Sequence, residues 1–359
     1  MREGTDLGFS DIETPAVLID VETAEANIRR FQDYCDQHGL SVRPHIKTHK
    51  IPELAKLQLS AGAVGINCQK IGEAEVMAEN GLDDILITYN IVGDAKLRRL
   101  RALADKVASL AVTADSETVI LGLSGAFSDA GRPLDVLVEC DTGGARCGVQ
   151  SPQEAFALAQ RIAGLPGLRL RGLMTYPAPG SAEAVEAFIG ETIGLLGAAG
   201  LECPVVSVGG TPDMWRAHLV PSATEHRPGT YIYFDRSMMA RGTCSEADCA
   251  ITVLVTVVST PAAGRAIIDA GSKALSSDLL GLQGHGYVIG RPDVGIAKLS
   301  EEHGHLEYPA DAEPLGIGDR LRIIPNHACV VSNLFDAVQF VRADRFERTV
   351  PVSARGKVT

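Results

Sequence analysis

Between residue 41 and about residue 235, short apolar and β-branched runs alternate with longer amphipathic segments. A two-residue period followed by a 3.6-residue period is typical of strands that lead into helices. The expected strands are residues 41–46, 63–67, 84–89, 109–112, 134–140, 168–176, 204–208 and 229–234. The expected helices include residues 51–61, 70–80, 94–106, 152–163 and 182–199. Eight strands with helical crossovers in roughly 195 residues favour a (β/α)₈ barrel over an open doubly wound sheet.

The two ends of the chain carry other patterns. A strand at 16–19 and a helix at 21–38 are expected before the first barrel strand. After residue 240 no strong helical period remains, and strand-like segments at 250–259, 265–270, 287–299, 321–324 and 337–342 are separated by Gly, Pro and Asp turns. We therefore expect a barrel with an N-terminal strand and helix over residues 1–240, and a β-rich domain over residues 241–359, with the boundary between 240 and 248.

Composition and charge narrow the class of protein. The chain has 359 residues, and its hydrophobic content of 45% with only 5% aromatic residues indicates a large core of Ala, Val, Leu and Ile. The formal charge of −12 argues against nucleic acid and anionic membranes as partners. No secretory h-region and no apolar run near ~18 residues is present, so we expect a cytoplasmic protein. Eight cysteines occur without a C-x-x-C pair.

Lys47 is the first candidate for chemistry. It follows the first expected strand, and barrel enzymes carry their reactive groups at the carboxyl ends of strands. A lysine becomes a useful amine nucleophile when neighbouring cations or desolvation lower its pKa. The neighbouring cations here are Arg43, His45, His49 and Lys50. The pattern favours a Schiff-base lysine, although a solvated basic loop has the same composition.

Small-residue turns form a second group of candidates. The seventh expected strand ends in Gly209, Gly210 and Thr211, whose backbone N–H groups and hydroxyl suit an anion. A second such turn, Gly229-Thr230-Tyr231, opens the eighth expected strand instead of ending it. A lysine at one strand end and an anion cradle at another suggest pyridoxal phosphate, which must be anchored at two points.

Arg146 lies in the turn 141–148 after the fifth expected strand. There it could donate a hydrogen bond to the phenolic oxygen of that cofactor; a turn with a surface arginine is the alternative interpretation. Tyr176, at the end of the sixth strand, is a candidate for contact with cofactor or substrate, and fits equally a core tyrosine with its hydroxyl at the rim.

His327 and Cys329 are the candidate metal ligands. At positions i and i+2 of an extended chain they point to the same side, and imidazole with thiolate suits zinc or a related divalent ion. Two ligands leave the shell incomplete, so a third ligand such as His285, or water, is needed. A packed histidine beside a buried thiol has the same sequence.

Five stretches together resemble one enzyme family. They are residues 43–50, 141–148, 209–211, 227–231 and 325–329. The chain resembles, over nearly its whole length, the D-threonine aldolase and eukaryotic-type D-serine dehydratase family, which belongs to the alanine-racemase-like, fold-type III pyridoxal phosphate enzymes.

The resemblance implies a role for each matched residue. Lys47 would form the imine with the cofactor, and Arg146 would approach its phenolic oxygen. Near the phosphate would lie Gly209, Gly210, Gly229, Thr230 and Tyr231. His327 and Cys329 would bind a divalent ion (Zn, Mn or Mg) that holds the substrate's β-hydroxyl. The family also implies a homodimer.

Three enzyme activities and one non-enzymatic function remain open. The first hypothesis is an aldolase that cleaves β-hydroxy-D-amino acids such as D-threonine to glycine and an aldehyde. Family aldolases carry a histidine shortly after the residue matching Tyr176, and none occurs here, so His45 or His49 would have to replace it. The alternative is a dehydratase acting on D-serine or 3-hydroxy-D-aspartate, with Lys47 removing the α-proton. A racemase needs a second acid/base group and no metal, and a non-enzymatic pyridoxal phosphate carrier needs no elaborate second domain.

Overall fold

In the computed structural model, residues 9–359 are described, and they form two compact units. The barrel unit contains residues 30–47, 51–229 and 356–359, and the sheet unit contains residues 9–29, 48–50 and 230–355. The N-terminal strand β1 (Ala16–Asp20) pairs with β10 (Ile251–Ala262) and β16 (Ala337–Arg342). The expected division into residues 1–240 and 241–359 therefore differs from the observed one, because β1 belongs to the second sheet and the later border lies at residue 230.

The barrel unit is built on eight parallel strands, as the sequence predicts. Their order is β2 (Ser41–Val42), β9 (Glu225–Arg227), β8 (Val205–Gly209), β7 (Leu168–Thr175), β6 (Leu134–Cys140), β5 (Ser109–Ala114), β4 (Asp84–Ile87) and β3 (Ile66–Cys68). A single bridge between His45 and Asn67 joins the two ends of this sheet. The chain therefore has a (β/α)₈ barrel, closed by the segment that carries Lys47.

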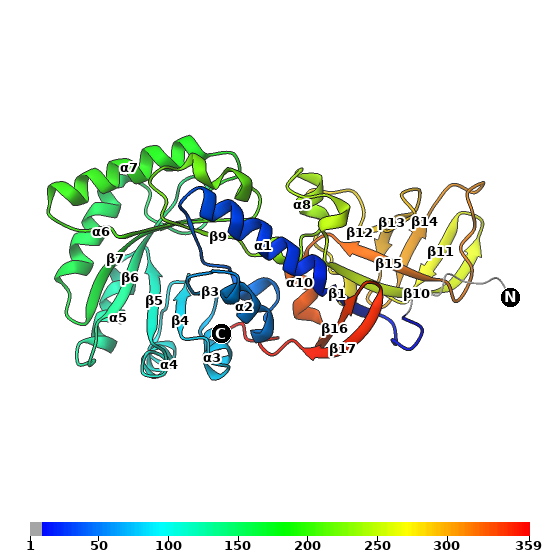
Figure 1. Cartoon of the computed structure of the whole chain (residues 1–359), viewed down its shortest axis with the longest axis horizontal. Helices are drawn as coiled ribbons and strands as arrows, with labels where there is room; N and C mark the ends of the chain where they lie inside the picture. The colour runs from blue at the N-terminus through cyan, green and yellow to red at the C-terminus, as the bar shows by residue number, and fades with distance from the viewer. Residues whose placement is uncertain (1–8) are drawn as a thin grey trace. The chain divides into compact units, whose positions relative to one another are not determined.

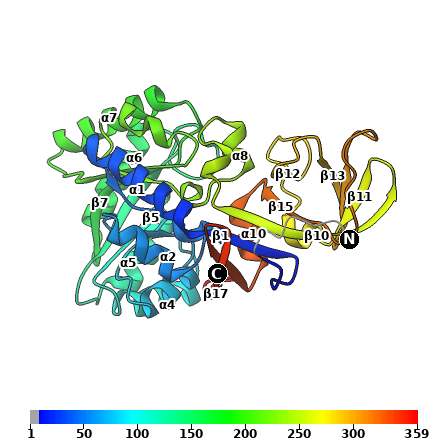
Figure 2. The ribbon, with the colours of Figure 1, turned by 45° about the vertical axis from the view of Figure 1, so that its right-hand side comes forward.

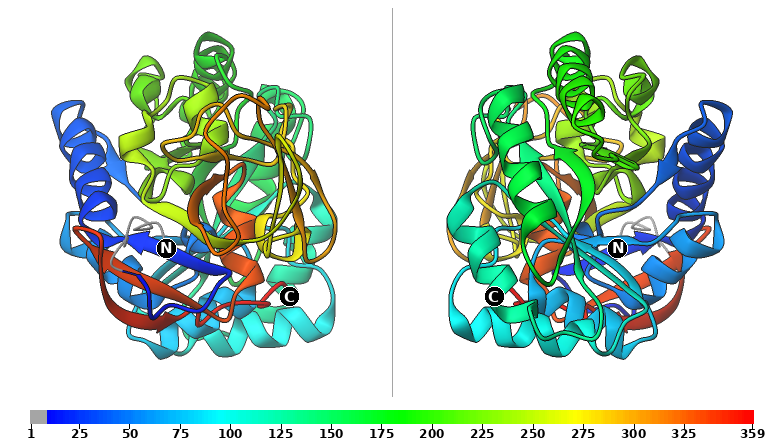
Figure 3. Two further views of the ribbon diagram at one scale, coloured as in Figure 1. Left: turned by 90° about the vertical axis from the view of Figure 1, so that its right-hand side faces the viewer. Right: turned by 90° about the vertical axis from the view of Figure 1, so that its left-hand side faces the viewer.

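Helices cover the outside of the barrel strands (Figures 1 and 3). They are α2 (Pro52–Ser60), α3 (Ile71–Glu79), α4 (Asp94–Ala104), α5 (Glu117–Phe127), α6 (Pro152–Gly164) and α7 (Ala182–Ala198). In α6, Ser151 accepts a hydrogen bond from the backbone N–H of Glu154, and Pro152 occupies the first helical turn. Its buried side chains are spaced at three and four residues and form one apolar face: Ala155, Leu158, Ala159 and Ile162.

The eighth barrel strand lies earlier in the chain than the sequence pattern predicts. The expected strand at 229–234 is wrong: residues Thr230–Ile232 form a 3₁₀ turn, and the strand is β9 (Glu225–Arg227). The pattern failed because β9 consists of three polar residues that are nevertheless buried. With this correction the Gly229 turn follows a strand end, as the Gly209 turn does.

The sheet unit is a mixed sheet of nine strands. Besides β1, β10 and β16 it contains β11 (Arg265–Ile268), β12 (Gly286–Val288), β13 (Gly295–Leu299), β14 (Gly304–Glu307), β15 (Arg320–Pro325) and β17 (Arg345–Pro351). Figure 2 shows the long strand β10, which pairs with β1 and β15 in its first part and with β11 in its second. Among residues 9–359 no helix has the length and apolar character needed to cross a membrane.

Short helices interrupt this unit: α8 (Arg236–Ala240), α9 (Ser272–Leu275) and α10 (Ala328–Leu334). The sequence pattern does not predict α10, which spans only seven residues. α1 (Val21–Gln37) is shared between the two units, whose border falls after Arg29.

Candidate active site

Lys47 lies in the 3₁₀ turn Ile46–Thr48, directly after the bridge that closes the barrel. Its side chain is partly buried. The backbone nitrogen of Lys47 lies 3.4 Å from Nδ1 of His45, and Nε2 of His45 lies 3.0 Å from Oε1 of Gln69. Since the amide oxygen of Gln69 accepts hydrogen bonds only, Nε2 carries the proton of the imidazole.

The charges around Lys47 differ from those that the sequence predicts. Burial first, and then the charge of Lys47, hold the pKa of His45 well below its usual range, so His45 is neutral at pH 7. Arg43 forms ion pairs with Asp84 and Glu225, which compensate its charge. The expected crowd of free positive charge is therefore wrong for Arg43 and His45.

The two glycine turns meet at the ends of β8 and β9. Ser207 pairs with Glu225 and Gly209 pairs with Arg227, so the strands end side by side. The backbone N–H of Gly229 donates to Oγ1 of Thr211 at 3.2 Å, which ties one turn to the other. The joined turns bring several small residues together, as close approach of an anion to the backbone requires. Binding of a phosphate by Gly209, Gly210, Thr211 and Gly229 stays a prediction.

His226 forms a hydrogen bond to the backbone of this cradle, and the sequence did not indicate this residue as part of the site. Its Nε2 lies 2.8 Å from the carbonyl oxygen of Gly210, and because a carbonyl only accepts, Nε2 is the protonated nitrogen. Burial lowers the pKa of His226 to about 4. A neutral imidazole thus holds the Gly210 carbonyl, at a glycine whose φ of +117° few other residues adopt.

Arg146 and Tyr176 lie against each other in the barrel unit. The guanidinium carbon of Arg146 lies 4.9 Å from the centre of the Tyr176 ring, a cation–π arrangement. The side chain of Tyr176 is 43% exposed, so it is not the buried core tyrosine of the alternative interpretation. Near them, a side chain at Gly144 would meet the backbone oxygen of Tyr176 at 2.6 Å, so glycine is required for this approach.

The His327 and Cys329 pair lies in the sheet unit. His327 is the N-cap residue of α10 and Cys329 is in its first turn, so the assumption of an extended chain is wrong. The two side chains nevertheless meet: although burial acts in the opposite direction, the Cys329 hydrogen bond and the nearby acids raise the pKa of His327 to about 9. Nδ1 of His327 lies 2.8 Å from Oδ2 of Asp278, so a metal ion would have to bind at Nε2.

Thr48, which belongs to the same unit as this pair, contacts Cys329. Oγ1 of Thr48 lies 3.1 Å from Sγ of Cys329, and Oγ1 of Thr230 lies 3.7 Å from the same sulfur. Thr48 directly follows Lys47 in the chain. The residues next to the candidate lysine and the candidate phosphate turn therefore contact the candidate metal ligand.

The remaining candidates are not all brought together. Within residues 9–359, no cluster of three or more His, Cys, Asp or Glu side chains could hold a metal ion, so His285 does not form such a cluster with the pair. His49 is fully buried and its ring packs edge-on against Tyr233, 6.4 Å between ring centres. Tyr231 is also buried. These positions give no direct sign of a role for His49 as a base.

Comparison with known proteins gives a consistent result. The alanine racemase N-terminal domain family matches residues 19–237, and the putative serine dehydratase domain family matches residues 250–341. The D-threonine aldolase of an Arthrobacter species is 34% identical, over 96% of this chain and 93% of its own length.

Two solved structures extend this likeness. The D-threonine aldolase of Filomicrobium marinum superposes with a TM-score of 0.91 and 34% identity, covering 97% of both chains. A D-threo-3-hydroxyaspartate dehydratase variant, in which a cysteine is replaced by alanine and which is in its metal-free form, gives a TM-score of 0.89 and 33% identity, covering 95% of this chain and 97% of its own.

Proposed function

The chain belongs to the alanine-racemase-like enzyme family of D-threonine aldolases and D-serine dehydratases, and from this membership we propose that it is a metal-activated, pyridoxal-phosphate-dependent aldolase of β-hydroxy-D-amino acids. It is thus a lyase in its general class. In the proposal, a D-threonine-like substrate is cleaved to glycine and an aldehyde. A cytoplasmic homodimer is part of the same proposal.

The barrel residues fit pyridoxal phosphate. The joined turns at Gly209 and Gly229 would hold the phosphate, because small residues meet there at two neighbouring strand ends and a side chain at Gly209 would collide with the guanidinium of Arg227. Lys47 would attach the cofactor, and Arg146, beside Tyr176, would donate to its phenolic oxygen. These residues lie at the ends of different strands, as is required to hold a cofactor that is anchored at two separate points.

The contact between Thr48 and Cys329 carries the metal part of the proposal. Thr48 directly follows Lys47 in the chain and lies in the same unit as the His327 and Cys329 pair. Asp278 holds Nδ1 of His327, an arrangement that metal-binding histidines usually have, and it directs Nε2 to the ligand. Two protein donors leave positions open for the substrate, which fits a catalytic ion better than a structural one.

Each group would supply a defined chemistry. Pyridoxal phosphate is an electron sink for the bond broken at Cα, and a divalent ion polarises the β-hydroxyl. Both ring nitrogens of His45 have partners and its pKa is low, so His45 orients the Lys47 segment and is a poor proton acceptor. Proton transfer near Cα is therefore assigned to Lys47.

Because its ring nitrogens are engaged and its pKa is low, His45 is a poor proton acceptor, and this also favours a second candidate function, that of a dehydratase. An aldolase needs a group to accept the β-hydroxyl proton, and no histidine follows Tyr176 to take this role. A dehydratase needs only Lys47 as base, together with departure of the hydroxyl group. Product identity separates the two.

Three variants test the proposal. Lys47→Ala should lose both the visible absorbance band of the bound cofactor and the turnover of D-threonine. His327→Ala, or chelation of the wild-type protein, should remove turnover and leave that band intact. His285→Ala is the matched control, because this histidine lies in the same unit outside the pair. Full turnover by His327→Ala would contradict the metal role.

A further inference from the structure

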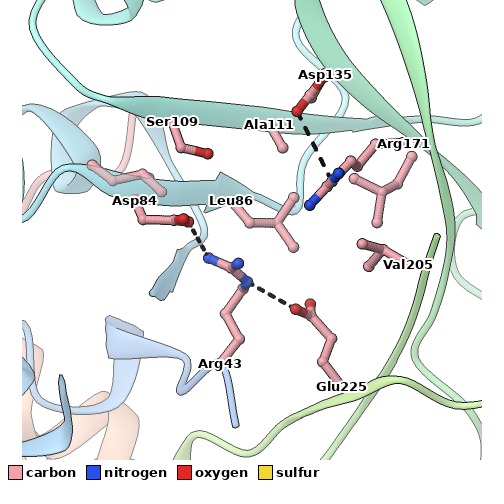
Figure 4. Close-up of a pocket in the computed structure, with 11 residues that line it drawn as sticks. Arg43, Asp84, Leu86, Ser109, Ala111, Asp135, Arg171, Val205 and Glu225 are labelled. Carbon is pink, nitrogen blue, oxygen red and sulfur yellow. Dashed lines mark hydrogen bonds and ion pairs between the residues drawn. The ribbon is translucent and has the colours of Figure 1, made fainter. Parts of the chain in front are cut away.

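A chain of polar side chains runs through the barrel, and Figure 4 shows its first part, in which Arg43 lies between Asp84 and Glu225. In this part, Nε of Arg43 donates to Oε2 of Glu225 at 3.0 Å, and Nη1 of Arg43 donates to Oδ1 of Asp84 at 2.6 Å. Asp84 and Glu225 are the first residues of β4 and β9. The side chain of Glu225 is only 6% exposed, whereas that of Asp84 is 40% exposed.

The chain continues from Glu225 to Arg227 through Ser207. The second carboxylate oxygen of Glu225 accepts a hydrogen bond from Oγ of Ser207, and Nη1 of Arg227 donates to the same hydroxyl. Side chains two residues apart on a strand share a face, which places Glu225 and Arg227 on the same side of β9. Ser207 pairs with Glu225 across the two strands, so its hydroxyl can bridge them.

Arg227 is a buried cation at the far end of this chain. Its Nη2 donates to the carbonyl oxygen of Thr175 at 2.9 Å, and a side chain at Gly209 would meet Nη2 at 2.7 Å. Burial lowers the pKa of Arg227 to about 10, and the negative charges of Glu225 and Glu139 oppose this shift. Of its five N–H donors, two are engaged among the residues that the structure describes.

The groups that face Arg227 come from several strands. They are Glu225 and Glu139, which favour its charge, Arg43, which opposes it, and the neighbouring Tyr176 and His45. No carboxylate among residues 9–359 forms a hydrogen bond with Arg227 directly. The counter-charge of Glu225 therefore reaches the guanidinium through one hydroxyl.

We propose that Glu225 and Ser207 are positioning residues that hold the guanidinium of Arg227 against the cofactor site beside Gly209, with Arg43 anchoring Glu225 from the other end of the barrel. This inference rests on the proposed function. Because Glu225 reaches Arg227 through the hydroxyl of Ser207 and not by a direct ion pair, this contact holds only one edge of the guanidinium. The other N–H groups of Arg227 remain for the cofactor site. Arg43, which precedes Lys47 in the chain, thus acts on Arg227 through Glu225 of β9 and not on Lys47 itself.

The test compares matched variants by a spectroscopic signature. Glu225→Gln removes the charge at nearly constant shape, and Ser207→Ala removes the bridge and leaves every charge in place. Asp135→Asn is the control, because this carboxylate lies at the same end of the barrel, pairs with Arg169 and Arg171, and lies outside the chain to Arg227. Each protein is titrated with pH while the visible absorbance band of the bound cofactor is recorded, and folding is checked by thermal unfolding.

The expected result has a definite sign. Without the negative charge of Glu225 the site becomes more positive, and a proton at the lysine–cofactor link is bound less well. The pH midpoint of the band should therefore fall by about half a unit or more in Glu225→Gln. Both variants release Arg227 from its hydrogen-bonded position, so each should bind the cofactor about tenfold more weakly, while Asp135→Asn matches the wild type. If Glu225→Gln keeps the wild-type midpoint, if Ser207→Ala binds the cofactor as tightly as the wild type, or if Asp135→Asn changes as far, the inference is wrong.

The outcome is distinguishable from failure of the proposed function. If the wild-type protein itself shows no lysine-dependent band with pyridoxal phosphate, the proposed function fails. If the band is present and insensitive to Ser207 and Glu225, only the positioning role fails.

Discussion

Replacing Gly209 by alanine should displace Arg227 and weaken cofactor binding. The added Cβ would lie 2.7 Å from Nη2 of Arg227 and 3.4 Å from Cδ2 of Tyr176. Arg227 is buried and hydrogen-bonded on two sides, so it cannot move away without stretching its bond to the Thr175 carbonyl. A hydrogen bond to a charged group is worth about 1.5–3 kcal/mol, which corresponds to roughly ten- to hundredfold in affinity.

The assay is titration of the cofactor-free protein with pyridoxal phosphate, followed by absorbance and by thermal unfolding. Gly197→Ala is the matched control, because it lies in α7 with nothing within 4 Å of the new Cβ. That variant should bind the cofactor normally and unfold at the same or a higher temperature, since alanine favours a helix over glycine by about 1 kcal/mol. Binding by Gly209→Ala within about twofold of the wild type would refute the packing of Arg227 beneath the cradle.

Two further predictions address the metal pair and the cradle. Asp278→Asn should lower the affinity for Zn²⁺ or Mn²⁺ by about 10–100-fold without changing the cofactor band; competition with a chelator measures this, and an unchanged affinity would remove Asp278 from the site. Since burial lowers the pKa of His226 to about 4 and an unfolded histidine titrates near 6.5, its contribution to stability is complete above pH ~6.5 and is lost as the pH falls toward 4, by up to about 3 kcal/mol. Urea unfolding at two pH values should show this loss in the wild type and a smaller one in His226→Gln, and equal losses would contradict the assignment.

The barrel was predictable because its strands and helices have different periods. Seven of the expected strand positions overlap with strands of the barrel, and the eighth does not. Residues 229–234 are aromatic and β-prone, yet they follow the strand, while Glu225, His226 and Arg227 form it. These polar residues can form a buried strand because other polar side chains inside the barrel pair with them. The pattern of hydrophobic positions in the sequence does not reveal that pairing.

The candidate site was predictable in its residue types and less so in its electrostatics. The Gly209 and Gly229 turns could be found by their small residues, and the structure joins them. Arg43 was expected to act on Lys47 because it is four residues away, but Asp84 and Glu225 neutralise it from distant strands. Such partners depend on strand register, which one sequence does not reveal.

The most direct test of the account is proton NMR of D-threonine incubated with the purified enzyme, pyridoxal phosphate and Mn²⁺ or Zn²⁺. The proposed aldolase predicts glycine and acetaldehyde in equal amounts, and their loss on chelation. Formation of 2-oxobutanoate with ammonia would contradict it and assign the chain to the dehydratases.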